Sequence, residues 1–398
     1  MRMDKINTKV MITVGTAREL FPEEVRVAIT PASAEFLLKK GFKVVVQSGC
    51  GIASGIKDQD YQSKGVEVVQ RREEVFDKAD FILYVRGPGS SREVEESDLK
   101  LLREGKSLIG FLEPLAFPEV SKKLAEMKVN AFSVELIPRI SRAQSMDALS
   151  MMATVAGYRA VIEAAKLSDK MFPMLMTSAG TTKPAKVFVI GAGVAGLQAM
   201  AMSKKLGAIV EGYDIRPETK EQVQSVGAKF VELGLETEET RAEGGYAKAM
   251  GEEFYRKQRE LMKKHVSEAD VVITTAQVPG KRAPVLITKD MVESMRPSSV
   301  IIDIAAEKGG NCELTQAGKV VDYNGVKIFG VVNPGSAYPT HSSYLYSMCL
   351  ANFLALFITK DGKFVVNFED EIIRDSAVCY DGKIVSPMVR KILDGSAK

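Results

Sequence analysis

Short apolar runs alternate with segments of helical periodicity along most of the chain, and glycine, proline and polar residues separate them. Apolar runs of this length between such breakers are typical of buried parallel strands. The runs in the first half occupy residues 10–15, 44–46, 67–69, 81–85, 108–111 and 131–134. Those in the second half occupy residues 187–190, 228–231, 271–276, 300–305 and 328–332, with a further run starting at Ile209. Strands that alternate with helices predict an α/β chain with two doubly wound domains.

Helix signals lie between these runs. Thr30 stands where an N-cap is needed, and Pro31 fits the first position of a helix that ends at Gly41. From about Ala143 to Leu167, apolar residues recur at helical spacing, which predicts a long helix connecting two domains. Residues 168–185 end in a run of breakers and predict a linker.

The domain boundaries follow from this order. The last 40 residues or so look like an addition to the first domain, which would make that domain discontinuous. We therefore expect a discontinuous N-terminal domain of residues 1–140 and 340–398. The second domain would comprise residues 141–339, including the linking helix.

The most specific pattern is the stretch from Lys186 to Asp214. Three glycines, at positions 191, 193 and 196, follow the apolar run in G-x-G-x-x-G spacing, and a helix from about Ala195 to Leu206 comes next. The first glycine permits a tight turn, the second lets backbone amides approach a diphosphate, and the third lets the helix pack closely. The helix N-terminus would face the diphosphate. The pattern predicts a dinucleotide site, and the alternative is a unit of this fold that holds no nucleotide.

An acid at the end of the next strand indicates which dinucleotide. Asp214 follows Gly196 by 18 positions (214 − 196), where a carboxylate hydrogen-bonds the adenosine ribose and repels a 2′-phosphate. This favours NAD over NADP. Arg216, two residues later, could in principle accept the phosphate of NADP, which keeps that cofactor as the alternative.

Composition excludes several classes of protein. The net charge is only +3 with acids and bases interspersed, so nothing suggests a nucleic-acid surface. The four cysteines lie far apart without metal-ligand spacing, which predicts reduced structural thiols. The N-terminal residues show no signal-peptide pattern. The apolar stretch from Tyr344 to Ile358 is too short for a membrane span and fits a buried helix.

The supply of acid–base groups is small. The two histidines, His265 and His341, fit a surface position and the start of a helix better than a catalytic role. A dehydrogenase acting on an alcohol or amine must move a proton together with the hydride, so it needs a positioned acid or base. Hydride transfer between two nicotinamide rings needs only their orientation.

A polar cluster stands near the expected boundary between the domains, where a cleft would hold the nicotinamide. Its members are Arg139, Arg142, Gln144, Ser145, Asp147 and Ser150. They offer hydrogen bonds to a carboxamide and a ribose but no obvious base. The alternative is a helix-start network in which Ser141 is the N-cap and Asp147 an ordinary acid of the first turn.

A long, charged and glycine-bearing excursion occupies residues 232–270. It is either a solvated helix with a flexible lead-in or a lid over the cofactor with Tyr246 and Met250 at its tip.

At these residues the sequence resembles, over essentially its whole length, the NAD(H)-binding component (domain I, the alpha or alpha-1 subunit) of proton-translocating NAD(P) transhydrogenase. The matching stretches include EEVRVAITP at 23–31, PRISRAQSMDALS at 138–150, VIGAGVAGLQA at 189–199, YDIRP at 213–217, GGYAKAMGEEF at 244–254, TTAQVPGKRAPVLIT at 274–288 and IDIAAEKGGNCELT at 302–315. The loop with arginine, glutamine and aspartate is the most specific of these.

The resemblance implies two Rossmann-like domains of the formate/alanine dehydrogenase type in a soluble homodimer. It implies binding of NADH on the cytoplasmic or matrix side and transfer of hydride to NADP+ that a partner domain, and not this chain, would bind. Membrane-spanning subunits or domains would couple the transfer to proton translocation. The chain would then be peripheral on the inner membrane through its partner subunits.

The resemblance also implies roles for individual residues. Arg139, Asp147 and Ser150 would orient the dihydronicotinamide, and Gln144 would help to align the two rings; these four are the expected catalytic residues. Tyr246 and Met250 match a mobile loop that closes over bound nucleotide. The expected cofactor-binding residues are Gly191, Ala192, Gly193, Val194, Gly196, Asp214, Ile215, Arg216, Gly245, Tyr246, Met250, Thr275, Ala276 and Gln277.

The alternative function is that of alanine dehydrogenase, an NAD-dependent amino-acid dehydrogenase that shares the EEVRVAITP region. That family places a lysine after the strand at 81–85 and a histidine near the strand at 108–111, where this chain has Arg86 and Glu113. Both departures argue against amino-acid oxidation. Arg26, the counterpart of a carboxylate-binding arginine, remains, and we interpret it as structural. A third hypothesis is a non-catalytic NAD sensor.

Overall fold

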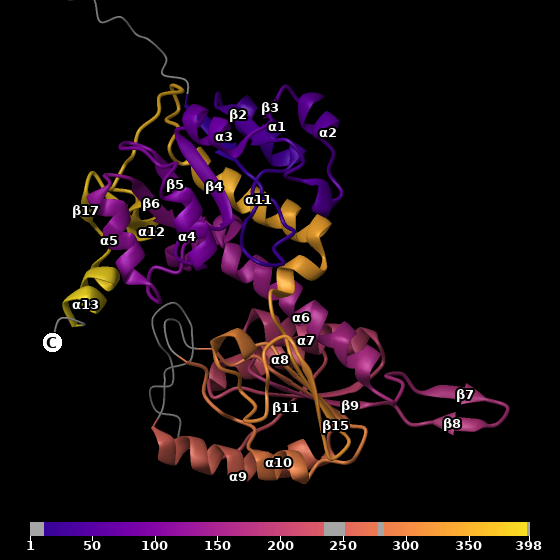
Figure 1. Ribbon diagram of the computed structural model, residues 1–398. Coiled ribbons are helices and arrows are strands. Elements are labelled where there is room, and N and C mark those ends of the chain that lie inside the picture. The colour runs from indigo at the N-terminus through magenta and orange to yellow at the C-terminus, as the bar shows by residue number, and fades with distance from the viewer. Residues whose placement is uncertain (1–11, 235–250, 278–281, 396–398) are drawn as a thin grey trace, which may run out of the picture. The chain divides into compact units, whose positions relative to one another are not determined.

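The structure is a computed structural model that describes residues 12–234, 251–277 and 282–395 of the chain (Figure 1). It contains two compact units. The first unit holds the residues up to Met151 together with those from Tyr338 onward, and the second holds Met152–Ala337. The units divide within helix α6 (Ala148–Leu167), whereas we expected the division between residues 140 and 141. The loop before α6 is therefore grouped with the first unit.

The first unit is built on a sheet to which the described residues contribute eight strands, in the order β17-β16-β6-β5-β4-β1-β2-β3. The strands are β1 (Thr13–Thr16), β2 (Lys43–Gln47), β3 (Glu67–Val69), β4 (Phe81–Arg86), β5 (Ser107–Phe111), β6 (Asn130–Ser133), β16 (Ala377–Tyr380) and β17 (Lys383–Ile384). All pairs from β3 to β6 are parallel, and β16 and β17 join antiparallel. The order β3-β2-β1-β4-β5-β6 reverses between β1 and β4, which makes this the switch point of a doubly wound sheet.

Helices flank this sheet. They are α1 (Pro31–Lys39), α2 (Asp58–Gln62), α3 (Arg72–Lys78), α4 (Arg92–Asp98), α5 (Pro118–Glu126), α11 (Pro339–Ala355), α12 (Glu371–Ser376) and α13 (Pro387–Gly395). The start of α1 is as expected: Thr30 caps it in a capping box with Ser33, and Pro31 is its first residue. Burial on both faces explains why the central strands read as continuous apolar runs.

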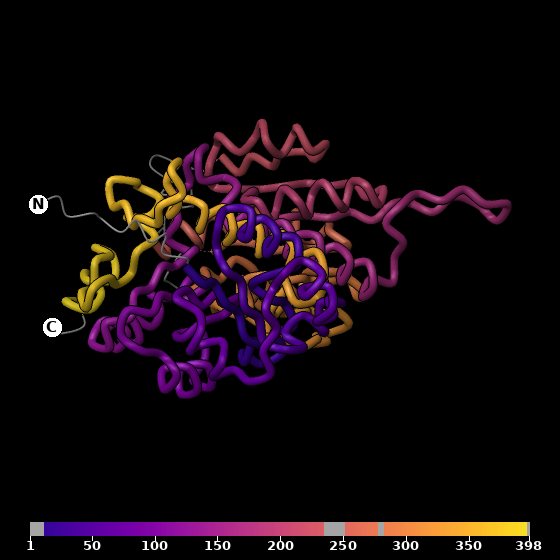
Figure 2. Tube along the Cα trace, turned by 90° about the horizontal axis from the view of Figure 1, so that it is seen from above, coloured from indigo at the N-terminus to yellow at the C-terminus, as the bar shows by residue number. Residues whose placement is uncertain are grey.

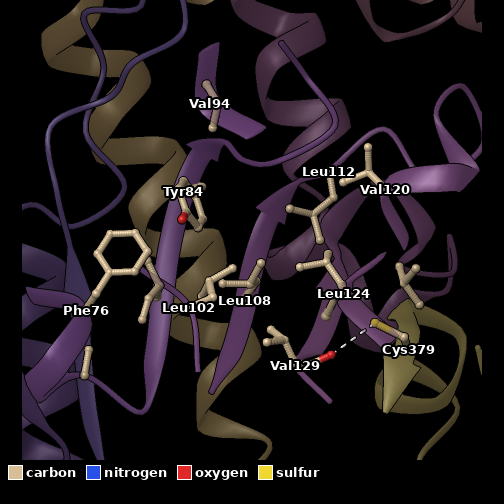
Figure 3. Packing of buried hydrophobic residues seen from close by; sticks show 14 of the residues in the cluster. Phe76, Tyr84, Val94, Leu102, Leu108, Leu112, Val120, Leu124, Val129 and Cys379 are labelled. Atoms are coloured by element: carbon tan, nitrogen blue, oxygen red, sulfur yellow. Dashed lines mark hydrogen bonds between the residues drawn. The ribbon is translucent and has the colours of Figure 1, made fainter. Parts of the chain in front are cut away.

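The C-terminal segment completes the first unit. Helix α11 packs against α1, and two serines on one side of it bond to the segment before α1. Ser343 Oγ accepts the backbone N–H of Val27 (3.1 Å), and the hydroxyls of Ser347 and Thr30 are 2.8 Å apart. In the core, Cys379 of β16 donates through Sγ to the carbonyl oxygen of Val129 (3.3 Å; Figure 3). The last part of the chain is thus an integral layer of the first unit.

The second unit is built on a sheet with seven strands among the described residues, in the order β11-β10-β9-β12-β13-β15-β14. The strands are β9 (Lys186–Ile190), β10 (Ile209–Tyr213), β11 (Lys229–Phe230), β12 (Val271–Thr274), β13 (Val300–Asp303), β14 (Val320–Tyr323) and β15 (Val326–Gly330). Its helices, besides most of α6, are α7 (Val194–Lys205), α8 (Lys220–Ser225), α9 (Glu252–Glu268) and α10 (Lys289–Glu293). Only β14 is antiparallel to its neighbour among these strands. The expected fold class, two Rossmann-like α/β units, is confirmed.

Three local features differ from the expectations. Residues 168–185 are not a structureless linker, because β7 (Leu175–Thr177) and β8 (Gly180–Thr182) form a hairpin there that projects from the second unit (Figures 1 and 2). The long helix begins at Ala148, and a 3-10 helix (Ser141–Met146) precedes it. Strand β14 gave no clear apolar run, because only part of this edge strand is covered.

Candidate functional site

The glycine-rich turn lies at the switch point of the second sheet. It joins β9 to α7 beside β12, where the strand order reverses. Gly191 has a φ of +101°, in the left-handed region that glycine tolerates. At Gly196, a Cβ would lie 1.8 Å from the carbonyl oxygen of Gly191. The turn and the close approach of α7 therefore require glycine at these two positions.

Gly193 has a different role in the turn. Its φ of −73° is open to any residue, and a Cβ built there meets no described atom within 4 Å. The fold thus does not need glycine at this position. What the missing side chain leaves open is the way to the N-terminus of α7, whose first residue is the exposed Val194. Such an open helix N-terminus fits the diphosphate of a dinucleotide.

Asp214 stands directly after β10 and is 8% exposed. Its Oδ2 accepts the backbone N–H of Ala192 (2.7 Å) and a guanidinium N–H of Arg216 (2.8 Å). Its Oδ1 accepts the Nε–H (2.8 Å) and the backbone N–H (2.9 Å) of Arg216. A carboxylate offers about four lone-pair sites. A ribose hydroxyl can therefore reach Asp214 only if Arg216 gives up a contact, which the sequence did not indicate. Ile215, between them, packs on the core under the turn.

The residues after β12 form one wall beside the turn. Thr275 donates through its backbone N–H to the carbonyl oxygen of Ile190 (2.9 Å), and its Oγ1 lies 3.2 Å from the carbonyl oxygen of Gly191. Ala276 bonds through its backbone to the side chain of Asn311. Gln277 is exposed and donates through Nε2 to the carbonyl oxygen of Ile304 (3.3 Å). This wall is shaped by backbone contacts, and nothing in the sequence had pointed to Asn311.

The four residues expected near the nicotinamide lie in the first unit. Arg139 and Gln144 are exposed, and Gln144 is part of the 3-10 helix. Asp147 caps α6: its Oδ1 accepts the backbone N–H of Ser150 (2.8 Å), and its Oδ2 accepts the hydroxyl of Ser150 (2.6 Å). Ser141 is not an N-cap, since Ile140 takes that place without a side-chain bond. The cap network that we had considered thus involves Asp147 and Ser150.

The C-terminal segment holds this loop in place. Arg142 forms two hydrogen bonds of 2.7 Å with the carboxylate of Asp370, which is itself the N-cap of α12. Asn352 on α11 donates through Nδ2 to the carbonyl oxygen of Ser145 (3.2 Å). The exposed side chain of Gln144 is therefore carried on a segment fixed on both sides. Gly245, Tyr246 and Met250 lie outside the described residues.

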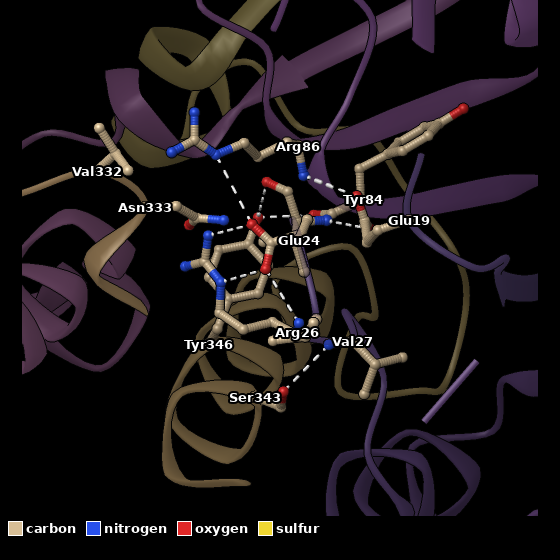
Figure 4. A network of polar contacts seen from close by, with 12 residues as sticks. Glu19, Glu24, Arg26, Val27, Tyr84, Arg86, Val332, Asn333, Ser343 and Tyr346 are labelled. Atoms are coloured by element: carbon tan, nitrogen blue, oxygen red, sulfur yellow. Dashed lines mark hydrogen bonds and ion pairs between the residues drawn. The ribbon is translucent and has the colours of Figure 1, made fainter. Parts of the chain in front are cut away.

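A second cluster of charges fills the switch point of the first sheet (Figure 4). Glu24 is buried and accepts three hydrogen bonds from Arg26, two of them from the guanidinium group at 2.7 and 2.6 Å. Arg86, at the end of β4, lies 3.7 Å from Glu24 and 3.9 Å from Glu113. Burial alone would lower the pKa of Arg26, but the hydrogen bonds and charge of Glu24 raise it above its ordinary value. Both guanidinium groups therefore face acids of the chain itself.

Glu19 belongs to the same cluster. Its carboxyl group accepts the backbone N–H of Val85 (2.7 Å) and of Arg86 (3.1 Å), which joins the segment after β1 to the end of β4. Burial, together with repulsion from Glu24, raises the pKa of Glu19 from 4.5 to about 8. The group is accordingly protonated in neutral solution, which lowers the excess of negative charge in the cluster.

Other candidate groups carry little chemistry. His265 bonds through Nδ1 to Glu211 (2.8 Å) and packs on Phe188, and His341 is exposed near the start of α11. All four cysteines are buried and free, as expected. Within the described ranges, no group of histidine, cysteine and acidic side chains could hold a metal ion. In that same portion of the chain, none of the helices has both the length and the hydropathy to cross a membrane.

Comparison with known families matches this architecture. The model of the alanine dehydrogenase/PNT N-terminal domain matches residues 15–156, and that of the C-terminal domain matches residues 160–387. The chain therefore belongs to the alanine dehydrogenase/PNT family.

Among its relatives are alpha subunits of NAD(P) transhydrogenase. That of Haemophilus influenzae is 46% identical over 376 residues, which is 94% of this chain and 72% of the relative. In Rhodospirillum rubrum, the first of the polypeptides that make up subunit alpha is 44% identical over 376 residues, 94% of this chain and 98% of the relative. The crystal structure of transhydrogenase from Sinorhizobium meliloti has a TM-score of 0.82 at 41% identity and covers 94% of this chain and 100% of that one. The resemblance inferred from the motifs is thus confirmed.

The alanine dehydrogenase branch is more distant. Alanine dehydrogenase of Methanococcus maripaludis is 27% identical over 391 residues, 96% of each chain. The solved structure of an L-alanine dehydrogenase has a TM-score of 0.79 at 23% identity over 96% of this chain and 99% of that one, which shows a shared fold.

Proposed function

We propose that the chain is the NAD(H)-binding component of a proton-translocating NAD(P) transhydrogenase and transfers hydride from NADH to NADP+ held by a partner domain. The names of its relatives support an oxidoreductase of this kind with NAD(H) as its cofactor. The observation that carries the proposal is the glycine turn at the switch point of the second sheet, with Gly193 open toward the start of α7. The backbone of the turn would hold the diphosphate, and Asp214 the adenosine ribose.

The chemistry of the loop in the first unit agrees with this proposal. When bound, NADH supplies the hydride, and the chain has only to orient its ring. Arg139, Gln144, Asp147 and Ser150 would do so through hydrogen bonds. Asp147 already accepts two hydrogen bonds from Ser150, which suits a fixed handle better than a group that shuttles protons.

The charged cluster of the first unit weighs against amino-acid oxidation. A substrate carboxylate would need a guanidinium group that is open to it, but Glu24 accepts both guanidinium bonds that Arg26 forms with it. The position after β4 carries Arg86, which lies beside Glu24 and Glu113. An arginine that is always charged does not act as an acid or base at neutral pH.

The decisive experiment is a hydride-exchange assay. The purified chain is mixed with an NADP(H)-binding component of a transhydrogenase, NADH and an NADP+ analogue, and reduction of the analogue is followed by absorbance. Exchange is expected only when both proteins are present. Oxidation of NADH by the chain alone with pyruvate and ammonia would instead identify an alanine dehydrogenase. Binding of NADH without activity in either assay would identify a non-catalytic NAD-binding protein.

Replacing Asp214 by alanine is expected to weaken NADH binding by about 10-fold or more, because hydrogen bonds to a charged group contribute about 1.5–3 kcal/mol. The change also releases Arg216 for a 2′-phosphate, so the affinity for NADPH should rise relative to that for NADH. Fluorescence titration with both nucleotides measures the ratio. Arg216→Ala is the matched control, since it leaves the carboxylate in place and should keep the preference for NADH. An unchanged ratio in Asp214→Ala would remove the acid from the ribose role.

Gln144→Asn is expected to slow hydride transfer about 10-fold while NADH affinity stays within about 3-fold, because the shortened side chain changes ring alignment and not binding. Gln144 is exposed, so the change should not disturb the fold. Single-turnover exchange gives the rate, and titration gives the affinity. The neighbouring exposed Ser141→Ala should change neither quantity. Equal transfer rates for the unaltered chain and Gln144→Asn would contradict the alignment role.

We also propose a homodimer bound to membrane-spanning partner subunits, on the cytoplasmic or matrix side of the inner membrane. The hairpin β7–β8 supports the dimer, because it and the segment before it expose large apolar side chains where a second copy could cover them (Figure 2). These are Met171, Met174, Leu175 and Met176, of which Met176 is 78% exposed. Light scattering that gives the mass of a single copy at micromolar concentration would contradict the dimer.

A further inference from the structure

A single buried side chain holds the backbone that follows β12. Asn311, which is 0% exposed, lies in the loop after β13. Its Oδ1 accepts the N–H of Ala276 (3.0 Å), and its Nδ2 donates to the carbonyl oxygens of Ala276 (2.9 Å) and Pro284 (2.8 Å). The amide thus pairs with both polar backbone groups of Ala276, as a neighbouring strand would. It also ties together two points of the chain that are eight residues apart (284 − 276).

Asn311 is itself fixed by the end of β13. Asp303, the last residue of that strand, accepts the N–H of Asn311 through Oδ2 at 2.7 Å. The same oxygen accepts the hydroxyl of Thr315 at 2.7 Å. The turn between them needs Gly310, whose φ is +79° and where a Cβ would lie 2.8 Å from Asp303 Oδ2. The carboxyl end of β13 therefore determines where the amide of Asn311 lies.

This chain of contacts continues to the glycine turn. Ala276 follows Thr275, whose N–H bonds to Ile190 and whose hydroxyl contacts the carbonyl oxygen of Gly191. If the backbone at Ala276 moves, the wall beside the turn moves with it. We propose that Asn311 is a positioning residue for the dinucleotide: it holds the backbone of Thr275 and Ala276 against the glycine turn and thereby sets the affinity for NADH without touching the cofactor. This inference rests on the proposed function, in which the turn binds NAD(H).

The chemistry of the side chain explains why it should be asparagine. Its three partners are one N–H donor and two carbonyl acceptors. An amide matches this set with one acceptor and two donors. An ionised aspartate has the same shape but no donor, so two carbonyl oxygens would face a negative charge. A protonated aspartate regains one donor, and alanine offers no partner at all.

These differences give a test by NADH fluorescence titration at pH 8 and pH 5.5, each variant being compared with the unaltered chain at the same pH. Asn311→Asp should bind NADH at least about 10-fold more weakly at pH 8, because leaving a buried polar group unpaired costs about 1–3 kcal/mol. At pH 5.5 the protonated side chain should restore affinity to within about 3-fold. Asn311→Ala should bind weakly at both pH values. Circular dichroism checks that each variant is folded.

Asp270→Asn is the matched control. Asp270 lies at the opposite edge of the same sheet, where it accepts the N–H of Lys186 (2.8 Å) and pairs with Lys170 (2.7 Å) and Arg296 (2.8 Å). This exchange of the same two groups should lower the unfolding temperature but leave NADH affinity within about 2-fold. A smaller loss of stability with a larger loss of affinity in Asn311→Asp would support positioning, since general destabilisation predicts the reverse.

Two results would overturn the inference. One is NADH affinity in Asn311→Ala and Asn311→Asp equal to that of the unaltered chain. The other is an equal loss in both variants with no recovery of Asn311→Asp at pH 5.5, which would assign the loss to packing. Failure of the unaltered, folded chain to bind NADH would contradict the proposed function instead, so the two failures are distinguishable.

Discussion

Gly196→Ala is expected to abolish NADH binding and to destabilise the second unit by more than about 3 kcal/mol. The added Cβ would lie 1.8 Å from the carbonyl oxygen and 2.8 Å from the carbonyl carbon of Gly191. Both are backbone atoms of a turn that β9 and β12 hold on either side, so they cannot move aside as the end of a flexible side chain would. The turn or α7 must shift, and either shift removes the close approach of helix and strand. Thermal unfolding and NADH titration measure the two effects.

Gly193→Ala separates the fold from the binding site. Because a Cβ at this position meets no described atom within 4 Å, the variant should unfold at nearly the same temperature as the unaltered chain. It should still lose NADH affinity, since the new methyl group stands where the diphosphate would approach the backbone. Full affinity in Gly193→Ala would show that the nucleotide binds elsewhere. An unchanged unfolding temperature in Gly196→Ala would contradict the steric role of that glycine.

Glu24→Gln is expected to destabilise the first unit by about 3–5 kcal/mol, as breaking a buried ion pair does. The side chains of Glu24 and Arg26 are 0% and 4% exposed, so water cannot replace the lost charge. Glutamine keeps the shape of the side chain but turns one acceptor oxygen into a donor that faces the guanidinium group. For a unit of this size the loss corresponds to a fall of roughly 10 °C in unfolding temperature. Calorimetry measures it directly.

An exposed ion pair provides the control for this prediction. Glu35 bonds to Lys39 and Lys64 in the same unit, at 2.7 and 2.6 Å, but all three side chains are at least 38% exposed. Glu35→Gln should leave the unfolding temperature close to that of the unaltered chain, because water and salt screen such pairs. If the two variants unfold at the same temperature, the buried cluster does not stabilise the first unit.

The sequence predicted those parts of the site whose signals are local. The run from Lys186 to Asp214 contains strand, turn, helix and second strand in one stretch, and β9, α7 and β10 lie within one residue of the expected bounds at most ends. The cap at Thr30 is equally local, because its partner Ser33 is three residues away. Short-range spacing encodes these features, so periodicity and residue type suffice to find them.

Contacts between distant segments could not be predicted in this way. Asn311 reaches Ala276 across 35 residues, and only the pairing of β12 with β13 brings their loops together. Arg216 was noticed as a possible phosphate ligand, but its bonds to Asp214 depend on rotamers that spacing does not determine. The hairpin β7–β8 was missed although a signal existed: two short runs flank Ser178 and Ala179, with Gly180 at a φ of +133°.

The interleaving of the two units has a consequence for synthesis of the chain on the ribosome. The second unit is one continuous segment, Met152–Ala337, so all of its strands have emerged while α11, β16 and β17 are still to be made. The first unit, whose sheet starts with β1, must wait for those last elements before α1 and β6 gain their partners. The half of the protein that is translated first is therefore the half that is finished last, and its apolar α1 surface is one that a nascent-chain chaperone would meet.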